Sequence, residues 1–106
     1  MKYALILLTA LSAQFASATI KCEDIGEIYP DGDELVVVYN DKMGFSDKND
    51  MGYLVSMGQG AADFRVNKWG ALLSIPFSLL GNKSVTDVIT VTLPESAPQQ
   101  VTCTLE

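Results

Sequence analysis

The apolar residues of this chain lie in short runs rich in β-branched and aromatic side chains, and glycine, proline, asparagine and aspartate separate these runs. The clearest run is Ser84–Leu93, in which valine, isoleucine and leucine share one face while threonine lines the other. An alternation with a period of two residues is typical of a half-buried strand. After residue 18, no segment gives a convincing long amphipathic helix. We therefore expect an all-β fold: a small antiparallel β-sandwich or flattened barrel of six to eight short strands.

The remaining expected strands are shorter or interrupted. They lie at Ile20–Glu23, Leu35–Tyr39, Tyr53–Met57, Asp63–Trp69 and Val101–Leu105. The segment Ala71–Leu80 is ambiguous because Pro76 has no N–H to donate, which favours an edge strand or a break, with a helical turn at Phe77–Leu80 as the alternative. Turn-forming residues predict a turn at Tyr29–Asp33 and loops at Asn40–Asp50 and Pro94–Gln100.

The first 18 residues have the pattern of a cleavable secretory signal peptide. Lys2 supplies a positive start, residues 3–11 form an uncharged apolar run, and Ala16-Ser17-Ala18 matches the A-x-A cleavage motif. The run is too short for a membrane span, which needs about 20 apolar residues. We expect cleavage after Ala18 and export to the periplasm or the extracellular space. The mature part, Thr19–Glu106, is then one domain with no membrane insertion.

The only two cysteines, Cys22 and Cys103, lie near opposite ends of the mature part. An exported chain meets an oxidising compartment, in which disulfides persist, and two cysteines allow a single intramolecular pairing. No C-x-x-C redox motif is present. We expect a structural disulfide that joins the first strand to the last. Closing a loop of this length stabilises a fold by roughly 4 kcal/mol in the chain-entropy model.

The mature part is strongly acidic. The chain has seven basic and 13 acidic residues, so removal of Lys2 leaves six basic residues and a net charge of −7. An acidic surface repels phosphate backbones, which makes a nucleic-acid partner unexpected. The same charge speeds the encounter with a basic protein partner. A simpler alternative is that the charge only keeps a small exported domain in solution.

Most catalytic chemistry is missing from the sequence. The chain contains no histidine, the usual general base and the commonest metal ligand. Both cysteines are expected to be bonded, and no glycine-rich phosphate loop or dinucleotide motif is present. We therefore expect no enzyme, no catalytic residues and no cofactor. A small hydrolase built on a pair of carboxylates is the catalytic option that remains.

Two acidic segments are weak calcium candidates. Asp31 and Asp33 lie at a turn, and Asp41, Asp47 and Asp50 lie in a polar loop. Extracellular modules often hold calcium weakly with such carboxylates. Neither segment follows the D-x-[DN]-x-[DN]-G pattern, and ordinary turns are also rich in aspartate. The sequence therefore assigns no metal site.

The best candidates for an exposed apolar contact are Phe45 and Trp69, with the charges of Asp41, Asp47 and Asp50 close by in sequence. The leading hypothesis is an exported, non-catalytic binding protein, in its sharpest form an acidic inhibitor of a basic secreted enzyme such as lysozyme. The chain resembles periplasmic lysozyme inhibitors in export, size, acidity and terminal disulfide, without their Ser-Gly-x-x-Tyr loop at Ser56–Gly60. The alternative is a structural or accessory subunit of an envelope assembly, joined by strand addition at the Pro76 edge. The oligomeric state stays open.

Overall fold

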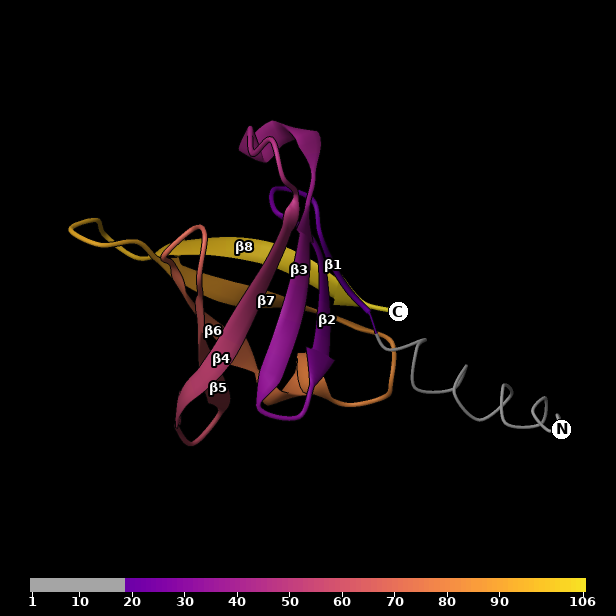
Figure 1. The fold of residues 1–106 in the computed structure, drawn as a ribbon. Helices are drawn as coiled ribbons and strands as arrows, with labels where there is room; N and C mark the ends of the chain where they lie inside the picture. The colour runs from indigo at the N-terminus through magenta and orange to yellow at the C-terminus, as the bar shows by residue number, and fades with distance from the viewer. Residues whose placement is uncertain (1–18) are drawn as a thin grey trace, which may run out of the picture.

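Eight antiparallel strands form a closed barrel in this computed structural model, which describes residues 19–106 (Figure 1). The expected signal peptide, residues 1–18, lies outside the described residues. Each strand pairs with its neighbours in sequence, and the first strand closes the barrel on the last. The strands are β1 (Ile20–Cys22), β2 (Gly26–Asp31), β3 (Glu34–Tyr39), β4 (Asn49–Met57), β5 (Ala61–Val66), β6 (Leu72–Pro76), β7 (Val85–Thr92) and β8 (Gln99–Leu105). The predicted small antiparallel all-β fold is confirmed, and its form is the barrel.

The interior of the barrel is filled by side chains from the strands. The buried apolar residues are Ile20, Cys22, Ile25, Ile28, Leu35, Val37, Tyr39, Ala62, Phe64, Val66, Ala71, Leu73, Ile75, Leu79, Ile89, Val91, Cys103 and Leu105. On β4 the inward position is Gly52, and a Cβ there would lie 2.8 Å from Leu35 Cδ1, so a larger residue would collide with the core. An eight-stranded barrel has room for its own side chains or for one small ligand, and here the buried side chains occupy it. We therefore look for binding surfaces on the outside of the barrel.

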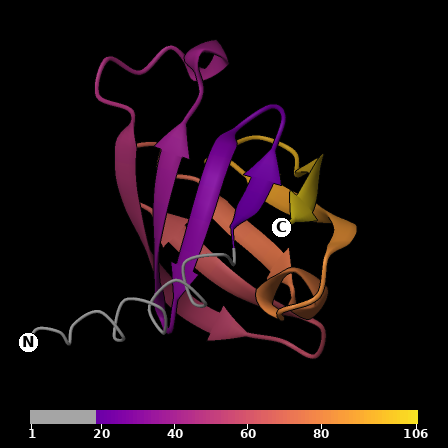
Figure 2. The ribbon, with the colours of Figure 1, turned by 90° about the vertical axis from the view of Figure 1, so that its right-hand side faces the viewer.

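Short segments cover the two ends of the barrel (Figure 2). At the upper end in that view, the β3–β4 loop carries a helical turn, η1 (Asp41–Met43). At the lower end, β6 is followed by the turn η2 (Phe77–Leu80), whose Leu79 side chain is fully buried. Of the alternatives left open for Ala71–Leu80, the structure has the helical turn at Phe77–Leu80. Neither turn in residues 19–106 is long or apolar enough to cross a membrane.

The barrel closes along a seam between β1 and β8. The predicted disulfide joins Cys22 to Cys103, which are directly opposite in register, with their Cα atoms 4.2 Å apart. One residue beyond the strands, Thr19 and Glu106 exchange two backbone hydrogen bonds with N···O distances of 3.3 and 2.9 Å. Because β1 has only three residues, the disulfide supplies a large part of this closure. Such a disulfide is compatible with an oxidising compartment.

Two expectations from proline were wrong. Tyr29–Asp31 is not a turn but the end of β2, in which Pro30 lies opposite Leu35. The proline is tolerated because β1 pairs only with Gly26–Ile28, so no hydrogen bond to β1 is lost. Pro76 does not mark an edge strand, because β6 is paired with β5 on one side and β7 on the other. β7 pairs with β6 only at Leu72, Leu73 and Ser74, so Pro76 lies beyond that pairing, at the point where β6 ends and η2 begins.

Candidate functional site

An aromatic cluster closes the β3–β4 end of the barrel. Tyr39, at the end of β3, is fully buried, and its ring centroid lies 4.6 Å from that of Phe45 and 5.9 Å from that of Trp69. The Trp69 ring meets Tyr39 edge-on, a favoured arrangement for aromatic pairs. Phe45 and Trp69 are half-buried and pack against the core. The two residues that we expected to offer an exposed contact thus lie together in this cluster.

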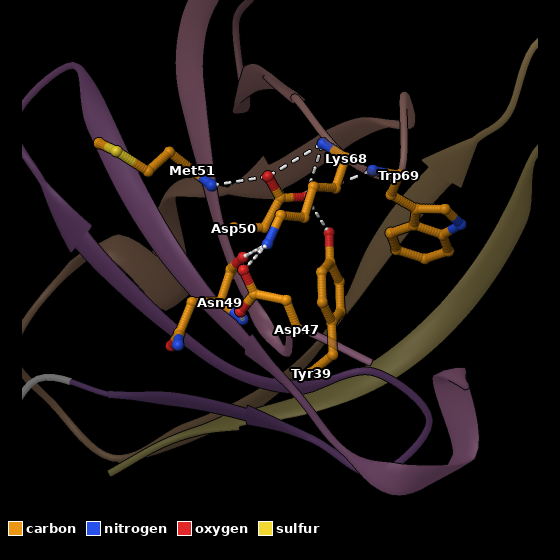
Figure 3. A network of polar contacts seen from close by, with 7 residues as sticks. All are labelled: Tyr39, Asp47, Asn49, Asp50, Met51, Lys68 and Trp69. Atoms are coloured by element: carbon orange, nitrogen blue, oxygen red, sulfur yellow. Dashed lines mark hydrogen bonds and ion pairs between the residues drawn. The ribbon is translucent and has the colours of Figure 1, made fainter. Parts of the chain in front are cut away.

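Beneath the cluster lies Asp50, the one charged residue buried within the described part of the chain, with 4% of its surface exposed (Figure 3). It belongs to β4 rather than to the expected loop. Its carboxylate accepts the Tyr39 hydroxyl and the backbone N–H groups of Met51 at 2.8 Å and Lys68 at 3.0 Å. The Trp69 N–H, at 3.3 Å, completes the set. Asp50 therefore holds the β5–β6 turn against β3 and β4.

The hydrogen bonds decide the charge state of this network. Burial raises the pKa of Asp50, but the bonds from Tyr39 and from three backbone N–H groups outweigh it and leave this pKa below its usual value. Burial and the neighbouring carboxylate raise the pKa of the Tyr39 hydroxyl, so it stays protonated and donates. With all its partners in place, the carboxylate is a structural element of the fold rather than an open site.

The other two aspartates of the loop are engaged by lysines. Lys48 bonds Asp41, and the Lys68 Nζ lies 2.6 Å from Asp47 Oδ2. Each lysine lowers the pKa of its partner carboxyl. Both pairs are exposed, so each contributes little to the stability of the fold. Their charges are matched within the loop, which leaves less negative potential there than the sequence indicates.

The calcium candidates are divided between the two ends of the barrel. Asp31 and Asp33 flank Gly32 at the β2–β3 turn, whereas Asp41, Asp47 and Asp50 lie at the β3–β4 end, at the top of Figure 2. Within residues 19–106, no three acidic or cysteine side chains gather closely enough to hold a metal ion. The structure thus gives no geometry on which to place a metal.

Acid should open this end of the barrel, and Trp69 can report it because it is the only tryptophan of the chain. The pKa of Asp50 is lowered by folding, so its contribution to stability is present above the unfolded-state value of about 3.9 and is lost as pH falls through the folded value. We expect Trp69 emission to shift to longer wavelength below about pH 4. An Asp50→Asn variant should lose most of this pH dependence. If Trp69 emission in the Asp50→Asn variant changes equally steeply with acid, carboxyl groups other than Asp50 cause the transition.

On the outside of the barrel, apolar side chains form a row across three strands. Tyr29 on β2 lies opposite Val36 on β3, which lies opposite Met51 on β4, and these three residues are the outer row. They are 36%, 38% and 38% exposed, and Tyr53, the next outward residue of β4, is 42% exposed. The sequence did not reveal the row, because Leu35–Tyr39 is apolar throughout and predicts burial on both faces. In the barrel, Leu35 and Val37 point inward while Val36 faces solvent.

Two features adjoin the outer row. A shallow hollow of about 470 Å³ is lined by Val36, Met51, Asn49, Asp50, Asn67 and Lys68. At the other end of the row, the β2–β3 turn carries Asp31, Asp33 and Glu34, which are exposed and form no ion pair with any residue that the structure describes. We call these three residues the acidic turn. Outer row, hollow and acidic turn together form the outer face.

The groups of the buried Asp50 network find partners within residues 19–106, whereas the outer row and the acidic turn stay open to solvent. The Asp50 network is complete, and the aromatic cluster is packed, whereas the outer face leaves apolar side chains and carboxylates in contact with solvent. Exposed apolar groups rimmed by charge are typical of interaction surfaces. The outer face is therefore the candidate functional site. Comparison of the chain with protein-family models, curated proteins and solved structures finds no match.

Proposed function

We propose that the chain is an exported, non-catalytic interaction protein that docks onto a basic protein through the outer face. One observation supports this most directly: the apolar outer row ends beside three carboxylates that no lysine or arginine of residues 19–106 neutralises. Aromatic and methionine side chains are enriched at the centre of protein interfaces. Charges at the rim steer the approach of a partner of opposite sign.

The expected partner offers an apolar contact surrounded by lysine and arginine. Tyr29 and Met51 would lie at the centre of the interface, and the hollow beside Met51 would receive a side chain of the partner. The acidic turn would act mainly on the rate of association, which then falls as salt rises. The sharpest version is an inhibitor of a basic secreted enzyme such as lysozyme, which fits a chain that carries no histidine for catalysis of its own.

The proposal is tested by reversing the chemistry of the outer face. In a Val36→Arg, Met51→Arg variant we expect affinity for the basic partner to fall by at least about 100-fold, because two cations replace the apolar centre. Thr90→Arg, on the outward side of β7, is the matched control and should bind normally. Lysozyme serves as the first probe, with binding and lysis rate measured together. An unchanged lysis rate with excess protein rejects the lysozyme version.

The effect of the acidic turn on the rate of association is tested with a separate variant. Asp31→Asn, Asp33→Asn, Glu34→Gln should slow association about tenfold at low salt and much less at high salt, because it removes the steering charges. Glu95→Gln, in the β7–β8 loop, is the control for a general loss of negative charge. Parallel capture from envelope and secreted extracts with the native chain and the double-arginine variant extends the test beyond lysozyme. A basic protein retained equally by both would show that the outer face is not the docking site.

A further inference from the structure

The long strand β8 has one side only partly covered. β7 pairs with all seven residues of β8, whereas β1 pairs only with Cys103, Thr104 and Leu105. Among the strand pairings of residues 19–106, none covers the β1 side of Gln99–Thr102. In Figure 1 the tip of the β7–β8 hairpin projects to the left beyond the other strands. We call Gln99–Thr102 the open edge.

The hydrogen bonds at the β1–β8 seam show which way the backbone groups of the open edge point. Glu106 exchanges both hydrogen bonds with Thr19, so its N–H and C=O point to the β1 side. Backbone groups alternate in direction along a strand, and the pairing of β7 with β8 is continuous. Gln100 and Thr102 therefore present their N–H and C=O groups to the open side. Gln99 and Val101 bond to β7.

The chain leaves these groups uncovered although it covers a comparable stretch of β7. There, the Asp87 carboxylate accepts the Val88 N–H at 2.8 Å and also the hydroxyl of Ser78. On the open edge, Gln99, Gln100 and Thr102 are exposed, and no lysine interrupts the stretch from Ser96 to Leu105. Exposed edges are usually protected by charge or proline, and here Pro98 protects only the entrance. Four backbone groups are thus available for pairing.

We propose that the open edge of β8 accepts an extended, basic segment of a partner protein, which adds a strand in line with β1 and antiparallel to β8. The negative charge near the open edge favours a basic segment as the added strand. Glu23, which follows β1, and Glu95, in the β7–β8 loop, stand near the two ends of the open edge, are exposed, and form no ion pair within residues 19–106. A second copy of residues 19–106 carries the same net charge of −7, from six basic and 13 acidic residues, and is repelled. This site is separate from the outer face and does not depend on it.

Hydrogen exchange on the mature, oxidised protein tests the geometry directly. In the free protein, the amides of Gln100 and Thr102 should exchange rapidly while Val101 and Cys103 are protected by β7. The probe is an alternating threonine–valine peptide with two lysines at each end. Its addition should slow exchange at Gln100 and Thr102 by at least about tenfold, and the same peptide with glutamates at its ends should not. Protection of both amides without peptide, or protection that rises only with protein concentration, would overturn the proposal.

A pair of variants separates the backbone from the side chain. Gln100→Pro removes an N–H that no strand of the barrel uses, so the fold should melt within a few degrees of the native protein while peptide binding is lost. Gln100→Ala keeps the N–H and should bind normally. Thr102→Pro repeats the test at the second outward residue. Native Trp69 emission verifies that each variant folds, and a folded Gln100→Pro protein that still binds the peptide refutes strand addition.

Discussion

Replacing Cys22 and Cys103 by alanine should lower the free energy of unfolding by about 4 kcal/mol, roughly 20 °C in melting temperature for a domain of this size. The two residues are 81 positions apart, so the bond removes much of the freedom of the unfolded chain. It also holds β1, a strand of three residues, at the place where the barrel closes. Because the free energy of unfolding of a native protein is only about 5–15 kcal/mol, the reduced protein should be marginally stable.

Urea unfolding of the oxidised, reduced and double-alanine proteins measures this effect. Cys22→Ala alone should lose almost as much as the double variant, because one cysteine cannot form the bond. Reduction of the native protein breaks the bond but leaves both cysteine side chains in the core. The reduced protein therefore shows the effect of the lost cross-link alone, without the loss of packing that alanine causes. Hydrogen exchange should become fastest in β1 and in Cys103–Leu105. Equal unfolding midpoints for oxidised and reduced protein would contradict the role that we give to the seam.

Asp50→Asn should lower the free energy of unfolding by about 2–4 kcal/mol, because it leaves buried backbone groups without an acceptor. The native carboxylate accepts bonds from Tyr39, Met51, Lys68 and Trp69, and within residues 19–106 it makes no ion pair. An asparagine amide offers one oxygen, and its NH₂ group would face donors. The β5–β6 turn would then lose its attachment to β3 and β4, and the Trp69 environment would change with it.

Asp47→Asn is the matched control, because Asp47 lies in the loop just before β4 and its carboxylate also contacts Lys68. That pair is exposed, so its loss should lower the free energy of unfolding far less than the loss of the Asp50 carboxylate. Thermal melts followed by Trp69 emission and by far-UV circular dichroism measure both variants. If Asp50→Asn melts within a degree of the native protein, the buried network is not the stabilising element that its hydrogen bonds indicate.

The sequence predicted the strands that alternate or are apolar throughout and missed β2. Ser84–Leu93 was expected because its apolar and threonine residues alternate, whereas the end of β2, Tyr29–Asp31, contains Pro30 and was expected to belong to a turn. The choice between sandwich and barrel depends on whether β1 meets β8. That contact joins residues at opposite ends of the chain, and local patterns carry no information about it. The disulfide could be predicted because only two cysteines are present.

The candidate site was less accessible to prediction. Asp50 follows several polar residues and looks like an ordinary loop aspartate, and only the folded chain shows it among backbone N–H groups. Phe45, in a polar loop, and Trp69, out of step with the alternation before it, were the best candidates for an exposed apolar contact, yet both pack on Tyr39. Val36 and Met51 lie on different strands, and only the register between β3 and β4 brings them side by side.

The position of the seam also sets the order of events when the chain is made. β2 to β7 can pair as soon as each hairpin has been synthesised, because every one of them meets a neighbour in sequence. β1 instead pairs with Cys103, Thr104 and Leu105 of β8, and the disulfide partners in these two strands are 81 positions apart. Such long-range contacts slow folding. Nearly all of residues 19–106 must therefore be available before the barrel can close, and a chain truncated before Cys103 cannot close it.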